Sequence, residues 1–144
     1  MRHENTGRPG RPSGARAGFI LALALGAATY AAWLAWDNEH YYDAALGAYQ
    51  GPYRPLQVLG CALTFLIVTA LLATRWKPLT VAVGASLGFW LFWTVQAGSQ
   101  DETVLFLVGS LFLAVGLTIG SALASVIGYG LRGRLKPLTA SRRP

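Results

Sequence analysis

The sequence predicts an all-α fold: a four-helix antiparallel transmembrane bundle with both termini in the cytoplasm. Three observations predict it. Charge is scarce, the charged residues are clustered, and the stretches between the clusters have the length of a membrane span. The chain has 144 residues, of which 53% are hydrophobic and 12% charged, whereas about 25% are charged in a typical soluble domain. The uncharged stretches are residues 17–36, 56–74, 79–97 and 104–129.

Each uncharged stretch is long enough for a helix that crosses a bilayer. The four contain 20, 19, 19 and 26 residues, and about 20 helical residues cover the roughly 30 Å of a hydrocarbon core. The runs are continuous and rich in Ala, Leu and Gly, whereas a membrane β-barrel needs about eight or more alternating segments of about ten residues. Helices are therefore predicted for all four stretches.

The first predicted helix, residues 17–36, follows a tail that is expected to be disordered, because residues 1–16 are rich in Gly, Pro and Arg. Arg16 before an apolar stretch also fits the start of a signal peptide. The stretch runs on to Trp36, beyond the roughly 7–15 residues of a signal peptide's apolar region. A retained span is therefore predicted, with a cleaved signal peptide within residues 1–36 as the alternative.

The remaining helices are separated by two short connections. Pro55 and Pro78 stand immediately before the second and third stretches, and proline is favoured where a helix begins. Residues 75–78 are a short link, so these two helices are expected to be antiparallel neighbours. The fourth stretch exceeds the length of a span and is expected to tilt or to project into the cytoplasm. The predicted membrane domain covers residues 17–131. A second basic tail, residues 132–144, follows it.

Charge along the connections predicts the orientation. Eleven of the twelve Lys and Arg residues lie in residues 1–16, 75–78 and 130–144, and Arg54 alone lies in the loop of residues 37–55. Basic segments stay on the cytoplasmic side during insertion. We therefore expect a multi-pass protein of the cell membrane, with cytoplasmic termini and loop 37–55 outside. This topology accounts for the net charge of +6, and no nucleic-acid partner is expected.

Small residues at four-residue spacing occur on every predicted helix. In lipid, such residues let helix backbones approach closely. The pattern favours packing within one bundle and leaves a homo-oligomer as the alternative. The glycines expected to pack helices are Gly18, Gly26, Gly84, Gly88, Gly116, Gly120 and Gly128.

The predicted spans contain no Asp, Glu, Lys, Arg or His. Proton-coupled transporters usually carry an ionisable residue within the membrane. The chain resembles small multidrug exporters in length and number of spans, but it lacks the glutamate that they carry in the first helix. A transporter or channel is therefore expected only as a subunit of an oligomer, and no cofactor is expected.

Loop 37–55 holds the only candidates for a metal site in the sequence. Carboxylates and imidazoles bind divalent cations, but the loop has one histidine and no recognisable ligand frame. A solvated acidic loop is favoured, so no metal and no catalytic residue is predicted. An outward-facing metal-dependent membrane enzyme is the third hypothesis for function. The weak candidates for metal ligands are Asp37, Glu39, His40 and Asp43.

Aromatic residues gather at the predicted outer ends of the helices. Tyr and Trp favour this depth, because one end of each side chain is apolar and the other is wet. We expect them to form an ordered surface that contacts a protein partner, a second copy or the lipid bilayer. The residues of this expected interaction surface are Trp36, Tyr41, Tyr42, Tyr49, Tyr53 and Trp93.

The outer loop also carries a resemblance. Its pattern of Trp36-Asp37, Tyr42-Asp43, Gly47, Gly51-Pro52-Tyr53 and Gln57 resembles the first outer loop of small four-span membrane proteins of GC-rich bacteria. The resemblance covers residues 17–131, implies no activity, cofactor or partner, and favours an ordered loop. The leading hypothesis is a small integral membrane protein with a structural or interaction role, and not an enzyme.

The orientation predicts which positions a membrane-impermeant thiol reagent reaches in intact cells. In a Cys61→Ala background, we expect Ala48→Cys to be labelled, and Ser13→Cys and Ser141→Cys to be shielded until the cells are permeabilised. Labelling of either tail in intact cells would show that the orientation is wrong.

Overall fold

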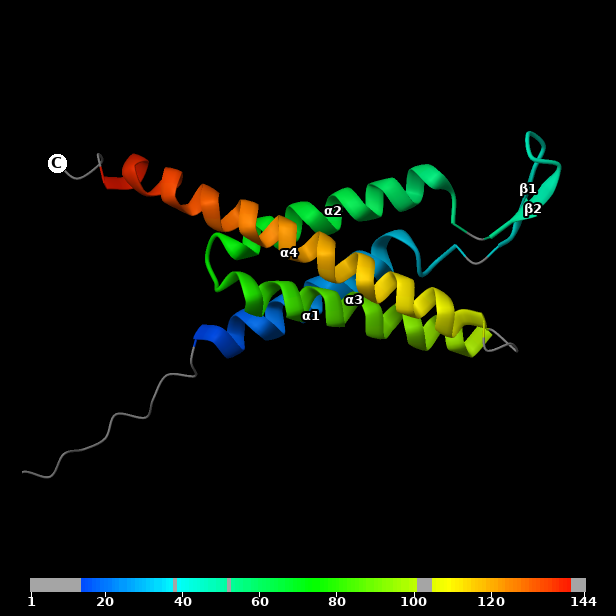
Figure 1. Cartoon of the computed structure of the whole chain (residues 1–144), viewed down its shortest axis with the longest axis horizontal. Helices are drawn as coiled ribbons and strands as arrows, with labels where there is room; N and C mark the ends of the chain where they lie inside the picture. The colour runs from blue at the N-terminus through cyan, green and yellow to red at the C-terminus, as the bar shows by residue number, and fades with distance from the viewer. Residues whose placement is uncertain (1–13, 38, 52, 101–104, 141–144) are drawn as a thin grey trace, which may run out of the picture.

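The computed structural model describes residues 14–37, 39–51, 53–100 and 105–140. Its helices are α1 (Gly14–Trp33), α2 (Pro55–Ala73), α3 (Pro78–Gln100) and α4 (Leu105–Ala140), and two short strands, β1 (Tyr41–Asp43) and β2 (Ala48–Gln50), lie between α1 and α2. Successive helices run in opposite directions (Figure 1). All four are long and apolar enough to cross a membrane. The prediction of an all-helical fold with four helices long and apolar enough to span a membrane is therefore confirmed.

The helix ends differ most from the predicted ones at α4. This helix continues to Ala140, so residues 132–140, expected to belong to a basic tail, are helical. Arg132 and Arg134 extend the helix as good helix formers, and the helix continues although the segment also contains Gly133 and Pro137. Helix α1 begins at Gly14, so residues 14–16, expected to belong to a disordered tail, are helical. Residues 1–13 and 141–144 of the expected tails and the acidic turn at 101–104 lie outside the described residues.

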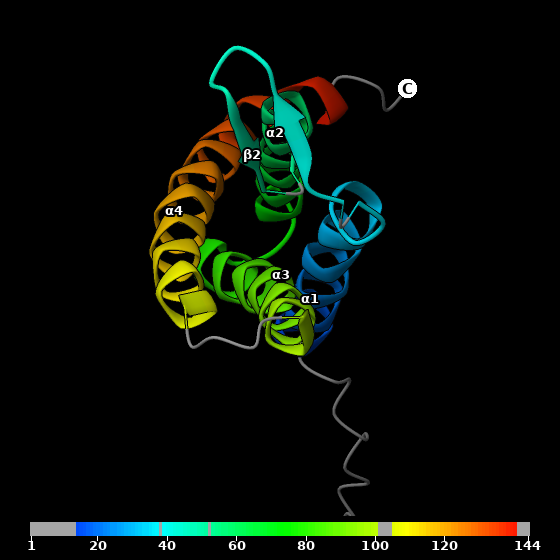
Figure 2. The same cartoon turned by 90° about the vertical axis from the view of Figure 1, so that its right-hand side faces the viewer.

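Around the bundle, the helices follow the order α1, α3, α4, α2 (Figure 2). Helix α3 therefore packs against α1 and α4. Helices α2 and α3 are joined by a short turn but lie diagonally and touch little. The expectation that this connection makes them packed neighbours is wrong, because the turn only reverses the chain and the shapes of the helix faces select the packing partners.

The most extensive packing in the bundle joins α1 and α3. A Cβ atom added at Gly26 would overlap the backbone of Ala85, and one added at Gly88 would overlap the backbone of Leu23. Gly84 faces the same helix and is fully buried. The two backbones thus touch along this line, which supplies the close contact that holds helices together where lipid removes the hydrophobic drive.

Two further glycines make close contacts at the end of the bundle opposite the strands. At Gly128, a Cβ atom would overlap the Ala70 backbone, so α4 and α2 meet here without intervening side chains. Gly18 leaves a notch on α1 that the indole ring of Trp76 fills from the turn between α2 and α3. This end of the bundle is therefore tightly closed.

Aromatic rings fill the core between α1, α2 and α3. The ring of Phe89 meets Tyr30 edge to face at 5.5 Å and Phe65 in the same manner at 5.6 Å. Such pairs add roughly 0.5–1.5 kcal/mol beyond burial of their area. Phe89 on α3 therefore links α1 to α2 across the centre of the bundle.

Hydroxyl groups connect α3 to α4. The hydroxyl oxygens of Ser86 and Ser121 lie 2.8 Å apart, and the Trp90 indole nitrogen donates to the Ser110 hydroxyl at 2.8 Å. Thr94 also bonds to Ser110, at 3.1 Å. Such bonds contribute roughly 0.6–2 kcal/mol between membrane helices. These side chains therefore act between helices, in addition to the local bonds that Ser and Thr form with their own helix backbones.

Glycine-to-alanine substitutions test the backbone contact. We expect Gly88→Ala to lower the free energy of unfolding by about 1–3 kcal/mol, because its methyl group has no space against Leu23. Gly130→Ala is the matched control, since nothing lies within 4 Å of a Cβ there and alanine improves helix propensity by up to about 1 kcal/mol. Thermal unfolding in detergent distinguishes them, and equal stability of the two variants would contradict the packing.

Candidate functional site

The connection between α1 and α2 forms a β-hairpin that projects beyond the helix ends (Figure 1). Strands β1 and β2 pair antiparallel, with Tyr42 opposite Tyr49. The turn is closed by the Asp43 carboxylate, which accepts the Ala45 N–H at 2.9 Å, and by Gly47 at a φ of 63°. Asp favours such turns because its side chain bonds to the backbone two residues on, and glycine adopts positive φ without a steric cost.

The hairpin presents apolar and aromatic side chains to the outside. The rings of Tyr42 and Tyr49 meet edge to face at 5.3 Å, yet these residues are 57% and 76% exposed, and Leu46 in the turn is 68% exposed. The guanidinium of Arg54, which precedes α2, lies 5.6 Å from the centre of the Tyr41 ring of the hairpin. The hairpin is thus internally ordered, and its large side chains are left uncovered.

The six residues expected to form one interaction surface lie in three places. Tyr41, Tyr42 and Tyr49 belong to the hairpin. Trp36 is 70% exposed and donates its indole N–H to the Ala32 carbonyl oxygen at 3.0 Å, at the end of α1. Tyr53 and Trp93 are half-buried and pack against the core. The hairpin projects away from the bundle, so these residues do not form one continuous surface.

The weak candidates for metal ligands do not come together. The Asp43 carboxylate closes the hairpin turn, and Glu39 and His40 are exposed. In the described ranges, no group of three His, Cys, Asp or Glu side chains is placed to hold a metal ion.

Two glutamines tie three helices together where the hairpin begins and ends. Gln57 on α2 donates its side-chain N–H to the Trp33 carbonyl oxygen, and Gln96 on α3 donates to the Ala35 carbonyl oxygen at 3.1 Å. The last carbonyls of a helix have no partner within the helix, so the two amides satisfy acceptors at the end of α1. This role could not be predicted from the sequence, because a lone glutamine near a helix end does not reveal its partner.

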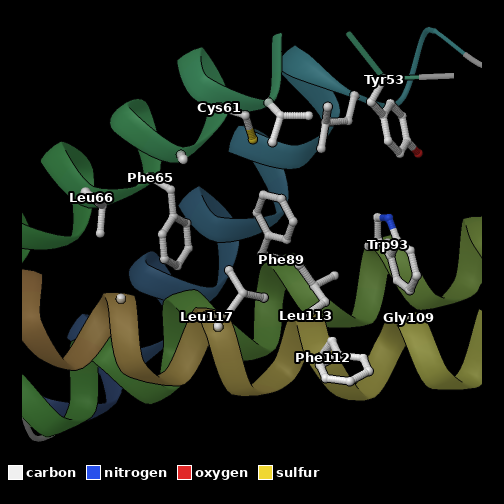
Figure 3. Close-up of a pocket in the computed structure, with 15 residues that line it drawn as sticks. Tyr53, Cys61, Phe65, Leu66, Phe89, Trp93, Gly109, Phe112, Leu113 and Leu117 are labelled. Atoms are coloured by element: carbon white, nitrogen blue, oxygen red, sulfur yellow. The ribbon is translucent and has the colours of Figure 1, made fainter. Parts of the chain in front are cut away.

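An apolar groove of about 620 Å³ lies between α2 and α4 (Figure 3). Phe65 points from α2, and Leu117 from α4, into the space between the two helices. Among the described residues, no charged side chain lines the groove. The lining residues are Leu34, Tyr53, Val58, Cys61, Ala62, Phe65, Leu66, Phe89, Trp93, Gly109, Phe112, Leu113, Gly116, Leu117 and Gly120.

Three glycines of α4 shape this groove. A Cβ atom at Gly116 would meet nothing within 4 Å, one at Gly120 would lie 3.6 Å from the Leu66 side chain, and one at Gly109 would lie 3.4 Å from Trp93. Gly116 and Gly120 therefore do not bring two backbones together, as the sequence analysis expected of them. They leave space beside α4, which the small-residue spacing alone does not distinguish from a packing contact.

Comparisons of the chain with protein-family models, with curated proteins and with solved structures found no match.

Substitutions in the hairpin test its order. We expect Gly47→Ala to destabilise the hairpin by about 1–2 kcal/mol, because residues with a Cβ atom rarely adopt a φ of 63°. Hydrogen exchange should then become faster at the amides of Tyr41, Asp43 and Ala48. Gly51→Ala is the control, since that position has free space and no positive φ. Equal exchange in both variants, as fast as that of an unstructured peptide, would contradict an ordered hairpin.

Proposed function

We propose that the protein is a small integral protein of the cell membrane, whose hairpin faces outward and binds a protein partner. Charge supports the orientation. The basic residues Arg75, Lys77, Arg132 and Arg134 lie at the end of the bundle opposite the hairpin, and basic segments are retained in the cytoplasm. The termini are then cytoplasmic and the acidic loop is outside.

The observation that carries this proposal is the exposed tyrosine pair of the hairpin. Tyr42 and Tyr49 are exposed on the hairpin, which stands beyond the helix ends. Tyrosine is enriched in the buried centres of protein interfaces, and a two-stranded hairpin alone is only marginally stable in water. A protein that packs on the rings or pairs with a free strand edge would stabilise the hairpin and bury its apolar surface.

The polar residues of the bundle favour an interaction role over a pore in an oligomer. A pore between subunits needs hydroxyl or amide groups on outward faces. Ser86, Ser110 and Ser121 are instead engaged between α3 and α4, and the exposed Thr118 bonds to the Ala114 carbonyl oxygen of its own helix. A contact function requires none of these groups to be free.

Photo-crosslinking in native membranes tests the proposal. A benzophenone amino acid in place of Leu46 should capture one defined protein, while the same group in place of Val126, which is 67% exposed on α4, should not capture it. We expect Tyr49→Ser to weaken the contact by about 2 kcal/mol, as loss of an interfacial aromatic anchor does. An equal pattern of products from both positions would contradict a specific hairpin partner.

A further inference from the structure

We propose that the groove between α2 and α4 is a binding site for one glycerophospholipid, with an acyl chain in the groove and the phosphate at Arg54. The groove is closed at one end and open at the other. Helices α2 and α4 touch at Gly128 and Ala70, and they separate toward the hairpin end (Figure 1). The groove occupies the separated part, with Phe89 and Trp93 of α3 as its floor (Figure 3).

The lining of the groove selects a hydrocarbon occupant. Its volume of about 620 Å³ falls within the roughly 300–1,000 Å³ of small-molecule sites. Water is a poor occupant, because an ordered water needs about two to four polar partners and the walls are formed by side chains such as Phe65, Leu113 and Leu117. An empty space of this size would forfeit the dispersion contacts of its lining.

The groove opens sideways, toward the hydrocarbon that surrounds a membrane helix bundle. Val58 and Phe112 line it and are still 46% and 74% exposed. They therefore form its rims and face the same surroundings as the outer faces of α2 and α4. An acyl chain can enter from the bilayer without crossing a polar barrier.

The depth of the groove matches one leaflet. Along α4, the lining extends from Gly109 to Gly120, a rise of about 16 Å in a helix, and half of a hydrocarbon core is about 15 Å. A helix from a second copy would cross both leaflets. The groove cannot accommodate one over that length, because α2 and α4 converge toward Gly128. One acyl chain of the leaflet on the hairpin side has the required length.

A cationic residue adjoins the open end of the groove in the chain. Tyr53 lines this end, and Arg54 follows it as the N-cap of α2. In the described part of the chain, the guanidinium contacts the Tyr41 ring and forms no ion pair. A cation–π contact at an exposed site contributes only about 0.5–1 kcal/mol, whereas arginine binds phosphate oxygens through two parallel hydrogen bonds.

Photolabelling of the full chain in vesicles tests the acyl-chain site. The probe is phosphatidylglycerol with a diazirine on one acyl chain, present in small amount in phosphatidylcholine. We expect Phe65, Leu113 and Leu117 to be labelled several-fold more than Leu63, which is 51% exposed on α2 but outside the groove. Labelling of the groove no stronger than that of Leu63 would overturn the proposal.

Two leucine substitutions provide a matched pair for this test. Gly116→Leu places a side chain in the groove, and Gly130→Leu places the same side chain outside it, and both positions have free space for a Cβ atom. Groove labelling should fall several-fold in the first variant only, with the thermal stability of both retained. Unchanged labelling in Gly116→Leu would overturn the proposal. A shift from dimer to monomer in that variant would assign the groove to a second copy and would also overturn it.

The phosphate contact is tested by a probe that lacks the phosphate. Diacylglycerol with the same photoactivatable acyl chain should label the groove several-fold less than phosphatidylglycerol does. Arg54→Gln should remove this difference and leave labelling of Leu63 unchanged. Equal labelling by the two probes in the natural chain would show that Arg54 holds no phosphate.

Discussion

The contact between the backbones of α1 and α3 is the constraint on which the rest of the bundle depends. Hydrocarbon surrounds the helices, so burial of apolar side chains gives little net drive for association. Gly26 and Gly88 compensate by bringing carbonyl groups and Cα atoms of the two helices into direct contact. Once these helices are paired, α3 can offer only its remaining faces to α4 and α2.

The positions of α2 and α4 follow from that pairing. Helix α4 is held along α3 by hydroxyl groups such as those of Ser86 and Ser121. Helix α2 is held at its two ends, by Gln57 against α1 and by Ala70 against Gly128 of α4. No comparable backbone contact joins α2 to α4 in the described residues between those ends. The groove is the result, because α2 and α4 touch at Gly128 and Ala70 and separate toward the hairpin, where Gln57 attaches α2 to α1 instead.

The spans could be predicted from the sequence because a membrane span is a local property of length and charge. Pro55 and Pro78 also indicated where α2 and α3 begin, since the preference of proline for a helix start is local. The groove and the separation of α2 from α3 could not be predicted, because they depend on which faces meet. Gly116 and Gly88 look alike in sequence, yet one faces open space and the other touches a backbone. An ordered loop was expected between the first two helices. That it forms a hairpin projecting beyond the helix ends was not predicted.

The different surroundings of the glycines divide them into classes of evolutionary constraint. Gly26, Gly88 and Gly128 admit no methyl group, so any related chain with the same bundle should retain glycine there for the sake of folding. Gly130 has free space, so related chains should carry various residues at this position. Gly116 has equal freedom within the fold, so its retention among relatives would reflect selection for the space beside α4 rather than for stability. Retention of Gly116 would therefore indicate selection for function, whereas retention of the other three glycines would indicate selection for folding.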